Sequence, residues 1–286
     1  MWILMVLVIL VLFNDSIYVT RIIITSKKIK NSIKFAVISD FHCANEKKIL
    51  KHLQQINPDG ILIPGDLIDE NWSLNSVERL LEGIKQWPCY FVSGNHEFKK
   101  GRTYKTFNQM EDLLEKYQIE LLDHRSVLVE LKGETIWLGG IKDHCSDRTK
   151  NPDELDQKHI NTVCSKCTPN YFTILMLHRP EQFRFVEEHA IDLLVSGHAH
   201  GGQWRLPGIN GLYAPQQGLF PKRAGGVYEM KHGFHLVSRG LAHYWFLPRL
   251  LNHREINVIE IKGSSKSFGV CQKLLGGTFR ERQEKS

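Results

Sequence analysis

The chain has 286 residues, of which 42% are hydrophobic and 24% charged, and its formal net charge is +6. This length and apolar content allow a substantial core and exclude a largely disordered protein. The mild positive charge favours contact with anions such as phosphates, but it identifies no nucleic acid partner and leaves the oligomeric state open.

The chain begins with thirteen uninterrupted apolar residues, MWILMVLVILVLF, and basic residues follow from Arg21 to Lys34. A bilayer span needs about 17 to 25 residues, so the run is short unless it extends past the polar residues 14–16. Neither a preceding Lys or Arg nor a following small-residue cleavage site marks it as a signal peptide. We expect residues 1–16 to associate the protein with a membrane and to leave its body cytoplasmic. A signal peptide and a buried core segment are the alternatives.

Residues 17–275 are predicted to form one globular domain, and residues 276–286 a polar tail. In the first half of the domain, strand patterns alternate with helical ones: strands over 33–39, 60–64 and 89–92, and helices over 46–56 and 76–86. The second half contains further strand patterns, over 127–131, 135–140, 171–177, 191–196, 234–238 and 256–261. This succession predicts an α/β fold of two stacked mixed β-sheets flanked by helices, in four layers.

Six cysteines are scattered along the chain, and two of them, Cys164 and Cys167, form a C-x-x-C pair. No second pair stands at zinc-ribbon spacing, so a disulfide framework or a zinc ribbon is not expected. We interpret the pair as two loop thiols, with a zinc or redox role as the alternative.

Five predicted strands end in side chains that can bind metals. These side chains are Asp40 with His42, Asp66, Asn95, His178, and His198 with His200. In α/β sheets, functional sites assemble at the carboxyl ends of the strands, and glycines before several of these residues permit tight turns there. Each motif alone is compatible with an ordinary turn, but five in succession indicate one site. Imidazoles mixed with oxygen ligands suit divalent ions such as Mn, Fe or Zn better than Ca or Mg.

The ordered motifs D-x-H, G-D-x-x-D, G-N-H-E, a lone His and G-H-x-H resemble the signature of the calcineurin-like metallophosphoesterases, over about residues 35–240. The resemblance implies that one metal ion is held by Asp40, His42, Asp66 and His200. It implies that the second is held by Asp66, Asn95, His178 and His198, which makes Asp66 the bridge. It further implies hydrolysis by attack of a metal-bridged hydroxide on phosphorus, with His96 protonating the leaving oxygen and Asp69 orienting His96.

Departures from relatives narrow the expected substrate. Glu70 and Asn71 stand where the protein Ser/Thr phosphatases of this superfamily have Arg-Gly, which disfavours a protein phosphatase. The LHRPEQF motif and the long loop after His200 resemble a bacterial branch that carries an N-terminal membrane segment. That branch includes enzymes that cleave the pyrophosphate of UDP-diacylglucosamine.

The resemblance therefore implies a metal-dependent phosphoric ester hydrolase that acts on a phosphodiester, pyrophosphate or phosphomonoester, including a membrane-associated one. Arg179, Gln203 and Arg205 are candidate contacts for the phosphoester substrate, with ordinary solvated side chains as the alternative. A UDP-2,3-diacylglucosamine pyrophosphatase-like enzyme and a non-catalytic metal-binding scaffold are the alternative functions.

Overall fold

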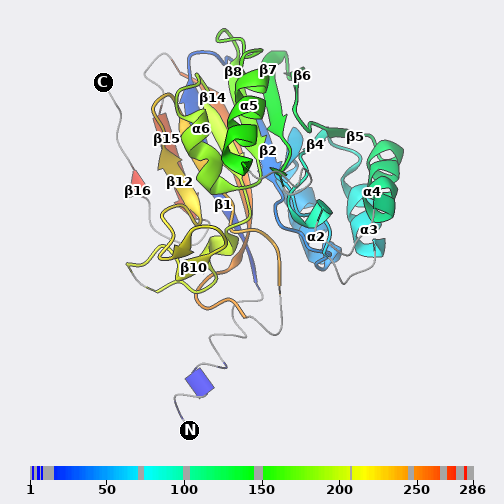
Figure 1. Cartoon of the computed structure of the whole chain (residues 1–286), viewed down its shortest axis with the longest axis vertical. Coiled ribbons are helices and arrows are strands. Elements are labelled where there is room, and N and C mark those ends of the chain that lie inside the picture. The colour runs from blue at the N-terminus through cyan, green and yellow to red at the C-terminus, as the bar shows by residue number, and fades with distance from the viewer. Residues whose placement is uncertain are drawn as a thin grey trace.

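The computed structural model describes residues 16–281 except 70–73, 99–103, 145–150, 207, 244–247, 265–268 and 275–279, together with Trp2, Met5, Val6 and Val8. Two large mixed β-sheets form the centre of the molecule, and helices cover them on the outside (Figure 1).

Among the described residues, the first sheet has eight strands. Their order is β16 (Arg280–Glu281), β15 (Gly269–Leu274), β1 (Ile17–Ser26), β14 (Arg254–Gly263), β2 (Ile33–Val37), β3 (Gly60–Ile63), β4 (Cys89–Phe91) and β5 (Ile119–Leu121). Strands β2 to β5 run parallel to one another, while β1 pairs in parallel with β14. β1 begins at the predicted start of the domain, and β16 lies within residues 276–286, where the sequence predicts a polar tail.

The second sheet has six strands in the described part of the chain, and a separate pair, β10 (Tyr213–Ala214) and β11 (Gly218–Leu219), stands apart from it. The order in the second sheet is β12 (Gly226–Glu229), β13 (Phe234–Val237), β9 (Leu193–Ser196), β8 (Phe172–Leu177), β7 (Glu134–Ile141) and β6 (Arg125–Leu131). Strands β13, β9, β8 and β7 are parallel, so their carboxyl ends share one edge.

In the described part of the chain, three of the apolar clusters hold the layers together. The cluster between the two sheets includes Val37 and Leu62 from one sheet and Ile174 and Met176 from the other. A second cluster joins the first sheet to α2 (Glu46–Ile56), α3 (Asn75–Ile84) and α4 (Tyr104–Lys116). A third joins the second sheet to α5 (Pro152–Cys164) and α6 (Phe183–Val186). The four-layer α/β fold predicted from the sequence is therefore confirmed.

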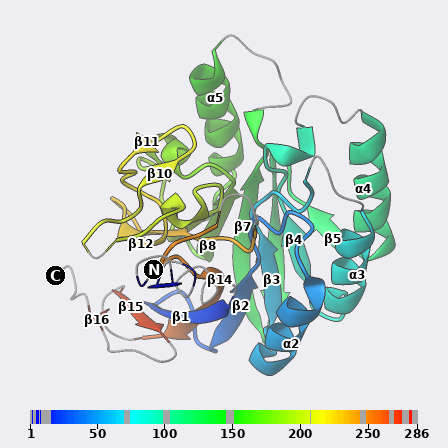
Figure 2. The ribbon, with the colours of Figure 1, turned by 90° about the horizontal axis from the view of Figure 1, so that it is seen from below.

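The helices that follow β2 and β3 are amphipathic and begin at the same edge of the sheet. In α2, Ile49, Leu53 and Ile56 are buried, and Asn45 caps the first turn by accepting a hydrogen bond from the Lys47 N–H at 3.0 Å. In α3 the buried residues are Val77, Leu80, Leu81 and Ile84. Each helix runs back across the sheet, so its first turn lies near the carboxyl end of the preceding strand (Figure 2).

The predicted membrane localisation is corrected by the structure. No helix among the described residues is long and apolar enough to cross a membrane. An α-helix rises about 1.5 Å per residue, so thirteen helical residues would span only about 20 Å of a hydrocarbon core about 30 Å thick. Trp2, Met5, Val6 and Val8 are helical with exposed side chains, and the rest of residues 1–15 lie outside the described part of the chain.

The C-x-x-C pair lies at the end of α5, where Cys164 is buried and Cys167 partly exposed. Both thiols are free, and burial raises the pKa of Cys164 to about 12. A thiol with such a pKa is protonated at neutral pH, which disfavours a redox role.

Candidate metal centre

The strand ends of both sheets bring the predicted ligands together. Asp40 and His42 follow β2, Asp66 follows β3 and Asn95 follows β4. In the second sheet, His178 follows β8, and His198 and His200 follow β9. Among the described residues, three groups of side chains have ligand atoms close enough to hold a metal ion: Asp40, His42 and His200; His42, Asp66 and His96; and Asp66, His178 and His198. The site thus lies where the two sheets meet.

Five of the predicted ligands have backbone conformations that non-glycine residues rarely adopt. The angle φ is 49° at Asp40, 45° at His42, 56° at Asp66, 66° at His198 and 46° at His200. Such conformations cost of order 1 kcal/mol or more each and persist only where surrounding contacts hold them. Here the N–H of His42 donates to the carbonyl of Asp66 at 3.2 Å, and that of His198 donates to Oδ1 of Asp40 at 2.9 Å. This concentration of strain is typical of a functional site.

One cluster of candidate ligand atoms, here called the first ligand cluster, surrounds Nε2 of His178. This atom lies 3.1 Å from Oδ2 of Asp66, 3.1 Å from Oδ1 of Asn95 and 3.1 Å from Nδ1 of His198. Atoms that bind one ion at about 2.0 to 2.2 Å lie about 3 to 3.5 Å apart, so the spacing fits a cation at the centre. The donor set of two imidazoles, a carboxylate and an amide oxygen suits a transition metal.

The second ligand cluster shares Oδ2 of Asp66 with the first. This oxygen lies 3.4 Å from Nε2 of His42, and Nε2 of His200 lies 3.7 Å from Oδ1 of Asp40. The other oxygen of Asp66 accepts a hydrogen bond from the backbone N–H of His96 at 2.9 Å, which fixes the orientation of the carboxylate. Asp66 is therefore placed to contact cations in both ligand clusters.

Groups around the two ligand clusters orient the ligand side chains. Nδ1 of His178 lies 2.8 Å from the carbonyl oxygen of Pro64, so a proton donated there leaves Nε2 free to bind a cation. Oδ2 of Asp40 accepts a hydrogen bond from the Ser39 hydroxyl at 2.5 Å. Gly65, with φ of 95°, leaves room for the His178 ring, because an added Cβ would lie 2.5 Å from its Nδ1.

The charges of the side chains in the site are arranged around Asp66. Burial opposes protonation of His178, but the Asp66 carboxylate outweighs it and raises the pKa of His178 to about 10. Burial and the positive charge of His178 lower the pKa of His198 to about 3, and burial also lowers the pKa of His200. Two of the imidazoles are thus neutral, as metal ligands must be, while a cation would take the place of the proton on His178.

Glu97 holds two of the site loops together, a role that the sequence analysis missed. Its buried carboxylate accepts hydrogen bonds from the backbone N–H groups of Asp66, Leu67, Ile68 and Gly94, at 2.7 to 3.3 Å. Burial, with the nearby Asp66, raises its pKa to about 7. The last position of the G-N-H-E motif was the available signal, because an acidic residue there has no place among the ligands.

We expect Glu97→Ala to lower the free energy of unfolding by at least about 3 kcal/mol, because several buried N–H groups lose their acceptor at about 1 to 3 kcal/mol each. Urea unfolding measures this loss. Glu82→Ala, at an exposed position on α3, is the matched control. A change within about 0.5 kcal/mol for Glu97→Ala, as for an ordinary surface residue, would show that these hydrogen bonds do not stabilise the loops.

His96 and Asp69, the predicted catalytic pair, both lie beside His42. The rings of His42 and His96 have centroids 4.4 Å apart, and His96 shares a group of potential ligands with His42 and Asp66. Oδ2 of Asp69 lies 3.5 Å from Nδ1 of His42. The geometry therefore places Asp69 against a predicted metal ligand and leaves His96 open to two roles, as an acid or as a ligand.

Arg179, a predicted substrate contact, is 5% exposed and lies against Asp143. Its Nε donates to Oδ2 of Asp143 at 2.5 Å, and its Nη2 donates to Oδ1 at 3.2 Å. Gln216 contacts Nε2 of His198 and, with its amide turned by 180°, its oxygen lies 3.1 Å from Nη1 of Arg179. Asp143 and Gln216 were not found from the sequence, since no motif marks them.

The other two predicted substrate contacts support the loop after His200. Arg205 donates to the carbonyl of Gly201 at 3.2 Å and to the side chain of Asn210 at 2.8 Å. The carbonyl of Gln203 accepts from Asn252 at 3.1 Å, and its backbone φ is 58°. These contacts give both residues a structural role in the loop, and a role in substrate binding stays a prediction.

The ion pair between His144 and Asp156 predicts a pH-dependent contribution to stability. Nδ1 of His144 lies 2.9 Å from Oδ2 of the buried Asp156, and this hydrogen bond raises the pKa of His144, with Asp143 adding to the effect and Arg179 opposing it. A His whose pKa is raised by folding stabilises the protein fully below its unfolded pKa of about 6.5, and the contribution disappears as pH rises through the folded pKa.

We therefore expect the stability advantage of the wild type over His144→Gln to shrink as pH rises above about 6.5. Urea midpoints at pH 6 and pH 9 measure it. In an Asp156→Asn background the same substitution should show little pH dependence. An advantage that stays constant or grows with pH would contradict the assignment.

The fold and the two ligand clusters together define the class of protein. It is an α/β protein with a metal-binding site at the strand ends. Residues 33–202 match the calcineurin-like phosphoesterase family, and the chain belongs to that family. The expectation drawn from the five motifs is confirmed at this level.

Relatives agree with this assignment, and one solved structure shares the fold. The chain is 29% identical over 194 residues to an uncharacterized metallophosphoesterase of Helicobacter pylori, covering 62% of this chain and 46% of the relative. It is 26% identical over 246 residues to an uncharacterized metallophosphoesterase of Campylobacter jejuni, covering 82% of this chain and 60% of the relative. The crystal structure of TT1561 from Thermus thermophilus has the same fold, with a TM-score of 0.51, 10% identity and coverage of 74% of this chain and 91% of that one. The chain spans about half of the length of the curated relatives it matches.

Proposed function

We propose that this protein hydrolyses a phosphoester with the help of two divalent cations such as Mn, Fe or Zn. The observation that carries the proposal is the position of Asp66, whose Oδ2 lies within 3.4 Å of histidine nitrogens from both ligand clusters. One carboxylate shared between two cation sites suits a dinuclear hydrolytic centre, in which the ions lie about 3.5 to 4 Å apart. Membership of the calcineurin-like phosphoesterase family supports it.

In this proposal Asp40, His42, Asp66 and His200 hold one cation, and Asp66, Asn95, His178 and His198 hold the other. When bound, the two ions supply the Lewis acidity that activates water and stabilises charge on the phosphoryl oxygens. The protein contributes rigidity, because the strained backbone and the second layer around Pro64, Ser39 and Glu97 fix the ligand atoms in advance.

His96 protonates the leaving oxygen in this proposal. Its backbone N–H donates a hydrogen bond to Asp66, and its ring stands edge-on to that of His42. These contacts hold the imidazole at the edge of the ligand clusters. Proton donation to a leaving group raises the rate by a factor typical of general acids, about a hundredfold or more. Arg179, held by Asp143, supplies fixed positive charge beside His178 for the phosphate.

A panel of four substrate classes tests the function: phosphomonoesters, phosphodiesters, cyclic nucleotides, and nucleotide-lipid pyrophosphates such as UDP-2,3-diacylglucosamine. We expect manganese-loaded protein to turn over at least one class, to lose that activity with a chelator and to regain it when metal returns. Protein with confirmed metal content that turns over none of the four would contradict the proposal and favour a non-catalytic scaffold.

A further inference from the structure

Gln216 lies at the turn between β10 and β11, and its side chain reaches the first ligand cluster. Its φ of 57° is a conformation that surrounding contacts must hold in a non-glycine residue. The amide contacts Nε2 of His198. The other ring nitrogen of His198, Nδ1, faces Nε2 of His178 at 3.1 Å inside the cluster. The turn is thereby joined to a predicted metal ligand.

The same amide lies beside Arg179. When the Gln216 oxygen accepts from Nη1 of Arg179 at 3.1 Å, the amide NH2 group donates to Nε2 of His198 and to the carbonyl of Pro215. Asp143 holds the other nitrogens of the guanidinium, with Nε at 2.5 Å and Nη2 at 3.2 Å from its two oxygens. One side chain therefore connects a predicted cation ligand with a predicted phosphate contact.

His198 reverses this amide when its Nδ1 binds a cation. A neutral imidazole has one N–H and one lone pair, so a ring that binds a cation through Nδ1 carries its proton on Nε2. That proton needs an acceptor, and the Gln216 oxygen is in place to provide it. Rotation about the last side-chain bond exchanges the two amide atoms at little cost. The NH2 group then faces Nη1 of Arg179 at 3.1 Å, so that two donors stand side by side.

We propose that, once the first ligand cluster holds a cation, the Gln216 amide and Nη1 of Arg179 together bind one non-bridging oxygen of the substrate phosphate. Two donors that face each other repel, and an anionic oxygen between them pairs with both. Gln216 is exposed, so the donor pair is open to solvent on that side. The inference rests on the proposed function, which places the phosphoryl group at the metal centre.

Gln216→Glu separates the two contacts of this side chain. The carboxylate has nearly the same shape and accepts from both His198 and Arg179, so the cation site keeps its support while the phosphate loses a donor. Calorimetric titration with manganese, and then with methylphosphonate at manganese saturation, measures both, because a C–P bond is not hydrolysed. We expect the manganese Kd to rise by less than about threefold and the methylphosphonate Kd by at least about thirtyfold.

Gln216→Met removes the donor and the acceptor without adding a charge. The methylphosphonate Kd should rise at least about tenfold, and the manganese Kd should also rise about tenfold because a metal-binding imidazole loses its acceptor. Leu219→Glu adds the charge of Gln216→Glu to the same hairpin, at a side chain that is 66% exposed. This control should change neither Kd by more than about twofold.

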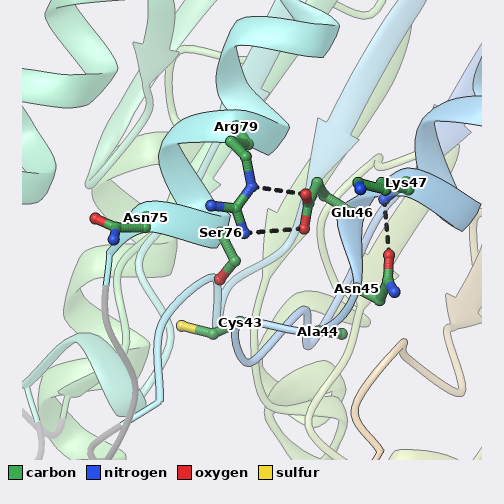
Figure 3. A pocket seen from close by; sticks show the side chains of 8 residues that line it. All are labelled: Cys43, Ala44, Asn45, Glu46, Lys47, Asn75, Ser76 and Arg79. Atoms are coloured by element: carbon green, nitrogen blue, oxygen red, sulfur yellow. Dashed lines mark hydrogen bonds and ion pairs between the residues drawn. The ribbon is translucent and has the colours of Figure 1, made fainter.

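Arg179→Lys keeps a positive charge beside Asp143 but removes Nη1, so the methylphosphonate Kd should rise about tenfold while the manganese Kd stays unchanged. Arg79→Lys is the matched control. Arg79 makes the same fork with Glu46, with Nε at 2.6 Å from Oε1 and Nη2 at 3.4 Å from Oε2, at the first turns of α2 and α3 (Figure 3). The control should leave both Kd values within about twofold of wild type.

The donor pair is overturned if manganese-saturated wild type does not bind methylphosphonate, or if either Gln216 variant binds it within about threefold of wild type. It is also overturned if Leu219→Glu weakens methylphosphonate as much as Gln216→Glu does, if Gln216→Glu no longer binds manganese, or if Gln216→Met binds manganese like wild type. Failure of the proposed function has a different signature. In that case the metal-loaded protein turns over no substrate of the panel, whatever the binding series shows.

Discussion

Asp66→Asn should lower kcat/KM by about a thousandfold or more while the protein remains folded. Oδ2 of Asp66 lies 3.4 Å from Nε2 of His42 and 3.1 Å from Nε2 of His178, so the substitution weakens both cation sites at once. Loss of several kcal/mol of charge stabilisation at the reacting phosphoryl group corresponds to a rate effect of this size. Turnover of the best substrate from the panel measures it, with metal content determined on the same sample.

Asp153→Asn makes the same chemical change at a side chain that is 67% exposed, and it should leave turnover unchanged. Circular dichroism should show the folded state for both variants, because Asp66 is a site residue and not part of the apolar clusters. Wild-type turnover by a folded Asp66→Asn protein would show that Asp66 does not bridge two catalytic ions.

His96→Ala should reduce kcat by about a hundredfold or more and leave the metal content unchanged, as expected when a general acid is lost. The reduction should be largest for substrates with poor leaving groups and small for a nitrophenyl ester, whose leaving oxygen needs no proton. Kinetics with both kinds of substrate and metal analysis of the purified variant measure these effects.

The exposed His232→Ala serves as the matched control and should be neutral. The result also decides between the two roles that the geometry allows, since His96 shares a group of potential ligands with His42 and Asp66. Metal content that falls in parallel with activity would identify His96 as a ligand and exclude the acid role proposed for it.

Local pattern was enough to predict much of the first sheet and its helices. The strands β2 and β3 are short apolar runs that are largely buried, and α2 shows its apolar side chains at helical spacing. β1 was not predicted, although it pairs with β14 over ten residues from Ile17 to Ser26. Its partner lies more than 230 positions away in the chain, and its first residues follow an apolar segment that was interpreted as a membrane anchor.

The cluster of candidate ligands could be predicted because each member stands at a strand end within a short motif, and its role in metal binding stays a prediction. The residues that orient the ligands could not, because their roles depend on contacts between distant segments. Asp143 reaches Arg179 from 36 positions away, and Gln216 reaches His198 from a loop 18 positions further along. Glu97 was part of a quoted motif, but only the fold shows that it accepts the N–H groups of the Asp66 loop.

Metal titration of the stripped protein tests the central claim most directly. Protein freed of metal by a chelator should be inactive on its best substrate and should regain activity as manganese is added, reaching a plateau at two equivalents per chain, with both equivalents lost in Asp66→Asn. Full activity in protein shown by elemental analysis to contain no metal would contradict the account, and so would a plateau at a single equivalent that Asp66→Asn leaves unchanged.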